Sequence, residues 1–412
     1  MDIIVNKSNI SGSVTAPPSK SYAHRLILAS FLSGQRVKIN NVGTSLDVLA
    51  TLNAVKSLGA SVEIYDNHVI VEKKKLVDGA IIDCNESGST LRFLMPIICA
   101  LNVNATLTGK PSLLCRPNDK LIKTLESGGG VIDGFKVGGK LKSGVYYLDA
   151  SISSQYVTGL LFALSILDGE SQIILENKIV SSPYIETTID VLKIFGVQVE
   201  FNKNVLKIVG NSYKNSVKEV TVEGDWSGSA FILSLGAING SITVKNLNVN
   251  SKQGDRAILE ILTNFGAKVS VNGSEVTVSN SELNAITVDI TNIPDLAQVI
   301  SAVASYANGK TVIKNIERLK IKESDRAQGI VNSLNAVGVN ALIKGNNIEI
   351  FGGNKLFGTV DGCNDHRTVM AGVVSVFNAN GAKILGAEAI NKSYPNFLEH
   401  FKKVGGEYNV II

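Results

Sequence analysis

Cysteine is scarce in this chain of 412 residues, and its four cysteines contain no Cys-x-x-Cys pair. No histidine lies at a spacing that would complete a zinc site with them, so we expect reduced, structural thiols. The sequence also lacks any apolar run of about 18 residues, which argues against a membrane-spanning helix. Aromatic residues make up only 6% of the chain and apolar residues 44%, a composition typical of a protein with a large aliphatic core.

Excess charge of either sign is small, since the formal net charge is +4. A nucleic-acid binder would show a concentrated basic stripe, so any anionic ligand must be bound by local groups. The first residues, MDIIVNKSNISGSV, alternate like a strand and lack the basic and apolar segments of a signal peptide. We therefore expect a cytoplasmic protein, and its length predicts two large domains.

A repeat with a period of about 70 residues runs through the whole chain. A helical pattern that ends at a glycine and continues as an alternating strand occurs six times. The six glycines lie 67 to 72 residues apart and are Gly59, Gly129, Gly196, Gly266, Gly338 and Gly405. A glycine at this position favours a left-handed helix C-cap, and the V-x-V pattern after it predicts a half-buried strand.

A second helix repeats with the same period and is almost wholly apolar, as in RLILASFLSG and VMAGVVSVFNANG. A helix that is apolar on all sides is buried, whereas the helix that ends at the repeat glycine is more exposed. Each repeat therefore predicts one buried helix, one exposed helix and several strands. Six such repeats predict an α/β protein with two domains of three units each.

Polar residues concentrate where these helices begin. Helix N-termini present unpaired N–H groups and a partial positive charge, which attract phosphate and carboxylate groups. If the three units of a domain surround a pseudo-threefold axis, their helix starts gather on one face. This pattern favours an enzyme that binds small anions in a cleft between two domains. The repeat alone is also compatible with a purely structural array.

Two helix starts illustrate the ambiguity of single motifs. In PPSKSYAHR, Ser21 and Arg25 lie four positions apart and so share one helix face, with Lys20 beside them. In NIPDLAQ, Asp295 stands at the start of a buried helix. An N-cap serine, a solvated lysine and an N-cap aspartate would explain these residues without any chemistry. Each motif is a candidate site only in combination with the others.

Two further helix starts carry several charges each. IKESDR places Lys322 and Arg326 four positions apart, with Glu323 between them, which a surface ion pair would also explain. NDHRTVM puts the charged run 365–367 at the start of an otherwise apolar helix. Charges at that place have no packing role, which favours a binding or catalytic function over a simple aspartate cap.

In this order, ten segments together resemble the EPSP synthase family of 3-phosphoshikimate 1-carboxyvinyltransferases. The segments are PPSKSYAHRLILA, SGSTLRFL, CRPNDKL, SSQYVTGLLFAL, SSPYIETT, EGDWSGSAFIL, NIPDLA, IKESDR, NDHRTVMA and NKSYPNFLE. The resemblance implies two domains of three βαβαββ units each, an inside-out α/β barrel. It implies one domain at 14–225 and a second formed by 1–13 with 226–412.

The resemblance also implies site residues by matching position. Shikimate 3-phosphate would be held by Lys20, Ser21, Arg25, Ser153, Ser154, Gln155, Ser181, Tyr184, Asp295 and Lys322. Phosphoenolpyruvate would be held by Lys20, Gly88, Arg116, Gln155, Arg326, Arg367 and Lys392. Asp295 and Glu323 would transfer protons with help from Lys20. No metal and no cofactor is implied, and the enzyme would be a monomer without nucleic-acid or membrane partners.

The reaction of this family explains the residue types. Joining an enolpyruvyl group to a hydroxyl requires a base for the alcohol and an acid for the methylene carbon, so two proton carriers must meet adjacent atoms. We assign Asp295 to the 5-hydroxyl and Glu323 to the methylene carbon. Arginine and lysine neutralise phosphate and carboxylate, so cleavage of the carbon–oxygen bond needs no metal.

Two alternatives differ in what they require. A UDP-N-acetylglucosamine 1-carboxyvinyltransferase of the same fold would carry a reactive cysteine several residues before its Arg-Pro, whereas Cys115 directly precedes Arg116. That enzyme would also have asparagine where this chain has Ser21. A repeat-built nucleic-acid clamp would need basic residues along helix faces rather than at helix starts. Three places depart from the first family. Many members have Asn-Ala-Gly-Thr at 86–89, some have asparagine at Arg318, and the run 118–120 differs from the usual run after Arg-Pro.

Overall fold

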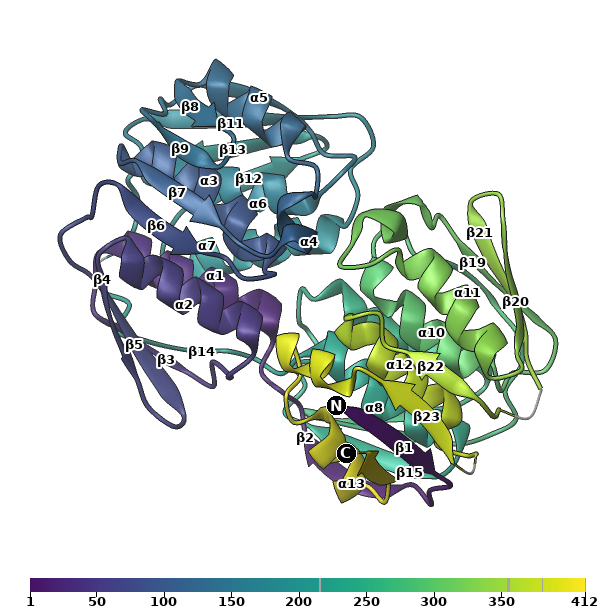
Figure 1. The fold of residues 1–412 in the computed structure, drawn as a ribbon. Helices are drawn as coiled ribbons and strands as arrows, with labels where there is room; N and C mark the ends of the chain where they lie inside the picture. Colours follow the sequence, from purple (N-terminus) through teal and green to yellow (C-terminus); the bar gives the residue numbers. More distant parts are fainter. Residues whose placement is uncertain (215, 354–355, 380, 412) are drawn as a thin grey trace. The chain divides into compact units, whose positions relative to one another are not determined.

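The computed structural model describes residues 1–214, 216–353, 356–379 and 381–411. The chain divides into two compact units, shown in Figure 1: a central unit, Lys20–Val222, and a terminal unit formed by Met1–Ser19 with Glu223–Ile412. The sequence-based boundaries at residues 14 and 225 stay a proposal. In this structure residue 14 lies inside strand β2 (Ser11–Thr15), which belongs to the terminal unit over its whole length.

The strands described in the central unit form three four-stranded sheets. In spatial order they are β14 (Glu219–Thr221), β3 (Val37–Asn40), β5 (His68–Lys73) and β4 (Ala60–Ile64); β6 (Ala80–Asp83), β7 (Ala105–Thr108), β9 (Lys136–Gly139) and β8 (Gly130–Asp133); and β10 (Val145–Asp149), β11 (Glu170–Glu176), β13 (Val205–Val209) and β12 (Val199–Asn202).

The terminal unit repeats this plan among its described strands. Its sheets are β2, β15 (Ser241–Lys245), β17 (Glu275–Ser279) and β16 (Lys268–Asn272); β18 (Thr287–Asp289), β19 (Lys310–Lys314), β21 (Asn347–Phe351) and β20 (Asn340–Lys344); and β22 (Thr359–Asp361), β23 (Ala382–Leu385), β1 (Asp2–Asn6) and β24 (Glu407–Ile411). Every sheet of both units has one parallel pair at one edge and two antiparallel pairs after it. The predicted sixfold repeat is therefore confirmed, and within the described residues each sheet is separate rather than part of a closed barrel.

Two strands pair within a different unit from the one whose first helix follows them in sequence. Strand β2 precedes the first helix of the central unit in sequence, yet it pairs in parallel with β15 of the terminal unit. Strand β14 precedes the first helix of the terminal unit after the crossover, yet it pairs in parallel with β3 of the central unit. Each unit thus takes one strand from the chain segment that leads into the other unit.

One buried helix per repeat forms the interior of each unit. These helices are α1 (Lys20–Ser33), α3 (Gly88–Leu101) and α6 (Ser154–Leu164) in the central unit, and α8 (Trp226–Ile238), α10 (Ala297–Ala304) and α12 (His366–Val376) in the terminal unit. In the terminal unit α8, α10 and α12 all contact one another. Burial of nearly every residue in these helices confirms the prediction from their apolar pattern.

More exposed helices follow the second strand of each repeat. They are α2 (Leu46–Ser57), α5 (Asp119–Ser127), α7 (Ser182–Ile194), α9 (Ile258–Phe265), α11 (Arg326–Ala336) and α13 (Phe397–Lys403). Shorter helical turns precede some of them, namely α4 (Pro111–Leu114), η1 (Gly254–Ala257), η3 (Glu317–Ile321) and η4 (Ala387–Lys392), whereas η2 (Pro294–Leu296) precedes the buried helix α10. The six repeat glycines that follow these helices have φ between +85° and +111°. This left-handed backbone is the predicted C-cap conformation, which glycine adopts without steric cost.

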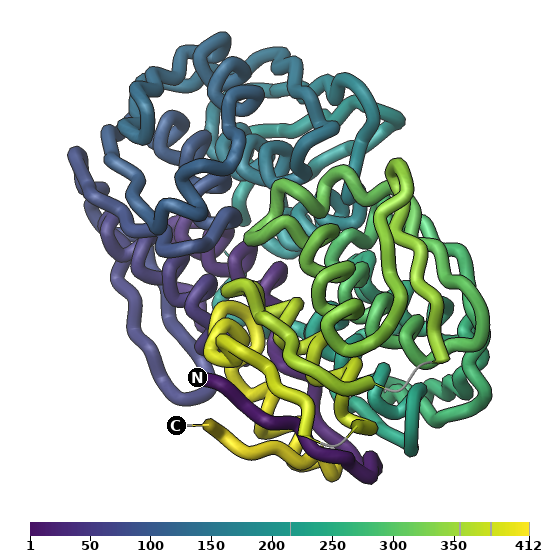
Figure 2. The backbone as a smooth tube through the Cα atoms, turned by 45° about the vertical axis from the view of Figure 1, so that its right-hand side comes forward, coloured from purple at the N-terminus to yellow at the C-terminus, as the bar shows by residue number. Residues whose placement is uncertain are grey.

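The first strand of the chain completes the last sheet. Strand β1 lies between β23 and β24 and pairs antiparallel with both, with Ile3 opposite Ile384 and Val410. Figure 2 shows the two ends of the chain close together for this reason. Ile3 and Val5 are fully buried, so the N-terminal strand contributes directly to the core of the terminal unit.

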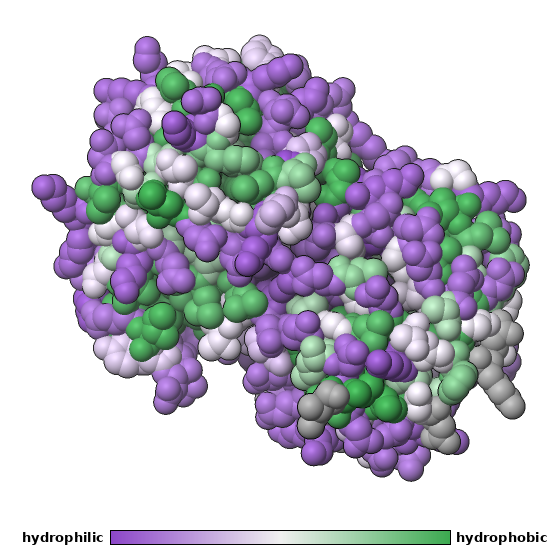
Figure 3. Space-filling model, viewed as in Figure 1, coloured by the Kyte–Doolittle hydropathy of each residue, from purple (hydrophilic) through white to green (hydrophobic). Residues whose placement is uncertain are grey.

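The outer faces of the sheets carry some exposed apolar side chains. Ile81 on β6 and Val131 on β8 are 72% and 65% exposed. Figure 3 shows hydrophobic surface over this part of the central unit, between polar side chains. All four cysteines are free thiols, as expected from their spacing. Among the described residues, helices that combine the length and apolarity needed to cross a membrane do not occur.

Candidate active site

The start of α1 brings three predicted residues of the central unit together with two other helices. Lys20 forms an ion pair with Asp47 of α2, with 2.7 Å between Nζ and Oδ2. Arg25 is buried and donates from Nε to Oγ1 of Thr188 at 2.9 Å and from Nη1 to the carbonyl oxygen of Ser21 at 2.8 Å. Its Nη2 donates to the carbonyl oxygen of Tyr184 at 3.0 Å.

Arg25 is therefore held mainly by the protein. Together with a longer bond to Oγ1 of Thr158, these contacts use four of the roughly five N–H donors of a guanidinium. Burial lowers the pKa of Arg25 to about 10, so the side chain remains charged at neutral pH. At most one donor remains for a substrate, and the main effect of Arg25 is to fix α1 against α7.

The start of α6 presents hydroxyl and amide groups. Ser153 is the N-cap residue, and its Oγ accepts a hydrogen bond from the backbone N–H of Gln155 at 3.2 Å. Ser154 is the first residue of the helix and is buried. Ser181 occupies the corresponding position before α7, with a left-handed φ of 53°. Ser153 thus caps α6 through its oxygen, and its O–H can still donate.

Gly88 begins α3 beneath two other predicted residues. A Cβ atom on Gly88 would lie 3.2 Å from Nη1 of Arg116 and 3.5 Å from Oε1 of Gln155. The third neighbour is Nη1 of Arg92, at 3.9 Å. Because residue 88 has no side chain, a space remains between the guanidinium groups of Arg116 and Arg92 and the amide of Gln155; we call this space the cradle.

The starts of α11 and α12 in the terminal unit are joined by one buried guanidinium. Arg326 is 1% exposed and contacts three carboxylates. Its Nε lies 2.7 Å from Oδ2 of Asp365, its Nη1 lies 2.9 Å from Oδ1 of Asp295, and its Nη2 lies 2.7 Å from Oε2 of Glu323. The two predicted proton carriers, Asp295 and Glu323, therefore lie on the same guanidinium.

Asp295 is surrounded by cations. Besides Arg326, Nζ of Lys322 lies 3.4 Å from its Oδ1 and Nη2 of Arg367 lies 3.6 Å from its Oδ2. Arg367 also donates from Nη1 to the backbone oxygen of Asp295 at 2.8 Å. Lys392 donates to the backbone oxygen of Asn364, just before the start of α12. The structure thus brings together the predicted residues of η2, α11 and α12.

The electrostatics of this cluster follow from burial and pairing. Burial raises the pKa of Asp365, but the charge of Arg326 outweighs it, so the pKa is lowered overall. Burial lowers the pKa of Lys322, while the charge of Asp295 opposes that effect. Burial and the nearby charge of Asp295 raise the pKa of Asp255 from 3.8 to about 7, against the influence of Arg367. Ionised and protonated carboxyl groups therefore coexist here near neutral pH.

The four histidines of the chain differ in how close they lie to these helix starts. His24 is buried, its Nδ1 lies 2.7 Å from Oγ1 of Thr51, and burial lowers its pKa well below the usual value. His24 is therefore neutral in this buried position. His68 is stacked on Tyr65 in a strand pair, and His400 contacts the hydroxyl of Tyr394. His366 begins α12, and its Nδ1 lies 4.0 Å from Oδ1 of Asp365.

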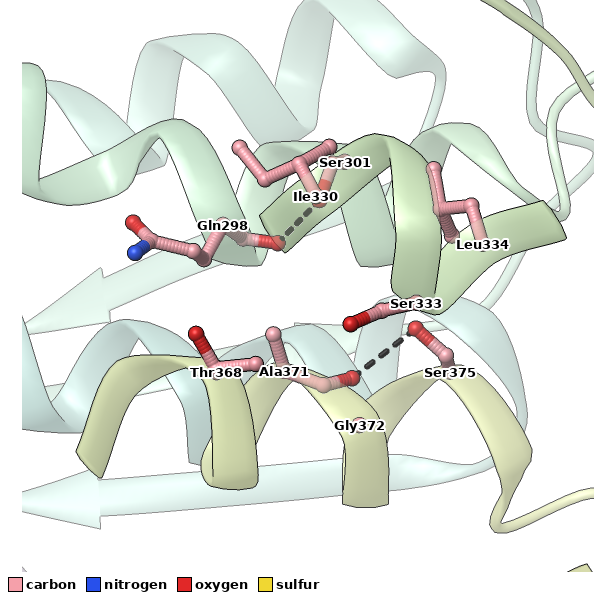
Figure 4. Close-up of a pocket in the computed structure, with 9 residues that line it drawn as sticks. All are labelled: Gln298, Ser301, Ile330, Ser333, Leu334, Thr368, Ala371, Gly372 and Ser375. Atoms are coloured by element: carbon pink, nitrogen blue, oxygen red, sulfur yellow. Dashed lines mark hydrogen bonds between the residues drawn. The ribbon is translucent and has the colours of Figure 1, made fainter. Parts of the chain in front are cut away.

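Two hollows in the described structure are lined by other residues than those predicted. One is a cavity of about 10 Å³ between α10, α11 and α12, shown in Figure 4. There Ser301 and Ser375 donate to carbonyl oxygens of their own helices. This volume is that of about one water molecule, too small for a substrate. The other, of about 240 Å³, lies beside β8 and β9 on the surface of the central unit.

Comparison with known proteins gives the chain its family. The sequence model of EPSP synthase (3-phosphoshikimate 1-carboxyvinyltransferase) matches residues 4–401. A 3-phosphoshikimate 1-carboxyvinyltransferase of Brachyspira hyodysenteriae is 37% identical over 420 residues, which covers 99% of each chain. One from Clostridium novyi (strain NT) is 35% identical over 424 residues and 98% of each chain. The chain belongs to the EPSP synthase family. It is an enzyme of the carboxyvinyltransferase class.

Solved structures show the EPSP synthase fold. An EPSP synthase from Acinetobacter baumannii has a TM-score of 0.83 at 22% identity and covers 100% of both chains. The enolpyruvyl transferase NikO from Streptomyces tendae has a TM-score of 0.79 at 16% identity and covers 99% of this chain and 98% of its own. At these identities the likeness concerns the fold, and it confirms the predicted α/β architecture.

Sequence reasoning missed several charged residues that lie beside the predicted ones. Arg92 lies one helical turn after Gly88 in an apolar helix, a spacing that could have revealed it. Asp47 is the partner of Lys20, and Asp255 is a buried carboxyl at the start of η1. These two could not be found from spacing, because their partners lie on other elements of the chain.

Proposed function

We propose that this enzyme transfers the enolpyruvyl group of phosphoenolpyruvate to the 5-hydroxyl of shikimate 3-phosphate and releases phosphate. The observation that carries the proposal is the position of Asp295 and Glu323 on one guanidinium, in a chain that matches the family over residues 4–401. An addition followed by an elimination needs two proton carriers close together, and a shared arginine keeps two carboxylates close without mutual repulsion.

In the addition step, Asp295 takes the proton of the 5-hydroxyl while the oxygen of that hydroxyl bonds to the second carbon of phosphoenolpyruvate. Glu323 gives a proton to the methylene carbon, which becomes a methyl group. In the elimination step the bond from this second carbon to the phosphate oxygen breaks, and phosphate leaves with the bonding electrons. Glu323 takes a proton back from the methyl group as the double bond forms again, and Asp295 passes its proton to the departing phosphate. Protons and electrons balance with no outside oxidant or reductant.

Cationic groups stabilise the charges of both substrates in this proposal. Seven residues are assigned to phosphoenolpyruvate: Lys20, Gly88, Arg116 and Gln155 in the central unit, and Arg326, Arg367 and Lys392 in the terminal unit. Arg326 already contacts three carboxylates, so its contribution to anion binding is smaller than its charge suggests. Arg367 lies 3.6 Å from the carboxylate of Asp295, which also contacts Lys322 and Arg326, so these three cations share one carboxylate.

Hydroxyl and amide groups at helix starts are assigned to shikimate 3-phosphate. They are Lys20, Ser21, Arg25, Ser153, Ser154, Gln155, Ser181 and Tyr184 in the central unit, with Lys322 and Asp295 in the terminal unit. The N-cap position of Ser153 and the burial of Ser154 support fixed donors at the start of α6. Because at most one donor of Arg25 remains, its proposed contact with the substrate is a supporting one.

We also propose a monomer that acts in the cytoplasm and binds neither nucleic acid nor membranes. The small net charge of +4 supports the lack of nucleic-acid binding. Sedimentation at micromolar concentration should give one species near 43.8 kDa. A species of twice that mass would contradict the monomer.

Phosphate release from phosphoenolpyruvate tests the substrate assignment. The purified enzyme is given phosphoenolpyruvate with shikimate 3-phosphate in one reaction and with UDP-N-acetylglucosamine in another. We expect release only with shikimate 3-phosphate, and proton NMR should show the vinyl signals of the new enol ether. Release only with UDP-N-acetylglucosamine would overturn the proposal, and Asp295→Asn serves as a control for contaminating phosphatases.

A further inference from the structure

Arg92 is an unusual residue for the place it occupies. It lies in the first turns of α3, whose sequence is GSTLRFLMPIICAL, and it is only 7% exposed. A buried cation in an apolar helix is costly unless its hydrogen bonds are made and its charge is used. Arg92 follows Gly88 by four residues, so both lie on the same face of α3.

The guanidinium of Arg92 joins three elements of the central unit. Nε donates to Oδ1 of Asn118 at 3.0 Å and Nη2 donates to the carbonyl oxygen of Pro117 at 3.0 Å. Nη1 donates to Oε1 of Gln155 at 2.8 Å. Because a guanidinium is a rigid planar fork, these bonds fix the loop after Arg116 relative to the start of α6.

The same contacts fix the amide of Gln155. Arginine can only donate, so the amide oxygen of Gln155 must face Arg92 and the amide nitrogen must face away. That nitrogen donates to Oγ of Ser89 at 3.0 Å. An amide nitrogen has two hydrogens, and only one is used by Ser89. The orientation set by Arg92 therefore places the amide oxygen of Gln155 3.5 Å from the position that a Cβ of Gly88 would take, and turns the amide nitrogen toward Ser89.

Tyr156 also contacts the loop after Arg116, independently of Gln155. The guanidinium carbon of Arg92 lies 5.4 Å from the centre of the Tyr156 ring. The hydroxyl of Tyr156 donates to the carbonyl oxygen of Pro117 at 2.6 Å. The loop that carries Arg116 is thus held by two residues, whereas the oxygen of the Gln155 amide is held by Arg92.

We propose that Arg92 is a positioning residue, which orients the amide of Gln155 and so sets the affinity for phosphoenolpyruvate without touching it. The inference rests on the proposed function, because it takes Gln155 and Arg116 as groups that bind this substrate. A role in folding alone would lower stability and leave the kinetic constants of the folded enzyme unchanged. A positioning role changes the KM for phosphoenolpyruvate through Gln155.

The first test is Arg92→Lys, which keeps the charge but not the fork. We expect the KM for phosphoenolpyruvate to rise about tenfold to a hundredfold, because a charge-assisted hydrogen bond is lost. Turnover should change by less than about threefold, since the amide of Gln155 carries no proton in the proposed reaction. An unchanged KM in a folded Arg92→Lys enzyme would overturn the inference.

A double-mutant cycle separates positioning from general damage. In a Gln155→Ala background, Arg92→Lys should change the KM for phosphoenolpyruvate by less than about threefold, because the group on which it acts is gone. Tyr156→Phe is the matched control, since it loosens only the loop, and its effect should multiply with that of Gln155→Ala. Multiplicative effects of Arg92→Lys and Gln155→Ala would refute the positioning role. So would equal coupling of Tyr156→Phe.

Two measurements keep the test independent of folding and of the substrate assignment. If Arg92→Lys does not fold, Gln155→Met leaves Arg92 in place and removes only its partner, and an unchanged KM then overturns the inference. A crystal structure of Arg92→Lys should show the Gln155 amide turned or displaced, whatever the enzyme's activity. An amide that keeps its place contradicts the inference, whereas a wild type that is inactive with shikimate 3-phosphate contradicts the proposed function.

Discussion

Nε of Arg326 lies 2.7 Å from Oδ2 of Asp365, and both side chains are almost completely removed from solvent. Each charge is stabilised by the other, because neither is solvated. Burial lowers the pKa of Arg326, but the charges of Asp365, Glu323 and Asp295 outweigh it and raise the pKa above its usual value. The pair therefore joins α11 to α12 as a permanent part of the fold.

Arg326→Ala should consequently destabilise the protein. Removing one partner of a buried pair leaves an uncompensated charge, at a cost of about 3–5 kcal/mol in the free energy of unfolding. Urea unfolding followed by the fluorescence of Trp226 measures this directly, because it is the single tryptophan and lies buried in the terminal unit. The exposed Arg256→Ala is the control and should stay within about 0.5 kcal/mol of the wild type. A loss in Arg326→Ala no larger than in this control would contradict the buried pair.

Asp295→Asn and Glu323→Gln should affect turnover more than binding. Removing a proton carrier lowers turnover by about a hundredfold to ten-thousandfold, whereas calorimetric affinity for shikimate 3-phosphate should change by less than about tenfold. Asp325→Asn is a matched control, because Asp325 is an exposed cap that accepts from the backbone N–H of Gln328. Near-normal turnover in both variants would refute the assigned roles.

The raised pKa of Asp255 predicts a dependence of stability on pH. Because the folded-state pKa of about 7 exceeds the ordinary 3.8, the folded state binds more protons between these values. The stability from the protonated carboxyl is complete below about pH 4 and is lost as the pH rises through 7. Asp255→Asn should therefore raise the melting temperature more at pH 8 than at pH 5. A gain that is equal at both pH values would mean that Asp255 titrates normally.

Gly88→Ala should disturb the cradle around residue 88. The added Cβ would lie 3.2 Å from Nη1 of Arg116, so that side chain must move. We expect the KM for phosphoenolpyruvate and the inhibitory concentration of glyphosate, which resembles it, each to rise by about tenfold. In Gly329→Ala the Cβ would meet only Oγ1 of Thr368 at 4.0 Å, and both constants should remain unchanged. Unchanged glyphosate sensitivity of Gly88→Ala would place Gly88 outside the pocket.

A substitution of Gln298 should raise the stability of the protein, whereas Arg326→Ala should lower it. Gln298 is 1% exposed, and neither atom of its amide has a hydrogen-bond partner among the described residues. Gln298→Met removes these polar atoms at similar length and should raise the melting temperature by about 2–4 °C. The exposed Gln328→Met should shift it by less than about 1 °C. A lower melting temperature in Gln298→Met would show that ordered water binds the amide.

The repeat could be predicted from the sequence because it depends on local backbone preferences. Gly59 and its five counterparts mark helix ends through a left-handed φ, which only the local chain decides. The exchange of β2 and β14 could not be predicted from their patterns. Both are short alternating segments before a buried helix, and the choice of partner depends on sheets formed by distant parts of the chain.

The site could be predicted only as a set of helix starts. Asp295, Lys322 and Arg326 were found through their motifs, but the motifs do not show which charges are already paired. The engagement of Arg326 by three carboxylates and of Arg25 by Thr188 and two carbonyl groups depends on packing between helices. Such contacts decide how much of each cation is left for a substrate.

The place of β1 between β23 and β24 sets the order in which the newly made protein can fold on the ribosome. Ile3 and Val5 are synthesised first, but their partner strands begin only at Ala382 and Glu407. At a synthesis rate of roughly 10 residues per second, this apolar segment waits more than about half a minute, long after the central unit is complete. Release of the last residues is therefore the step that closes the terminal unit, and a nascent chain truncated before Glu407 should remain a substrate for chaperones.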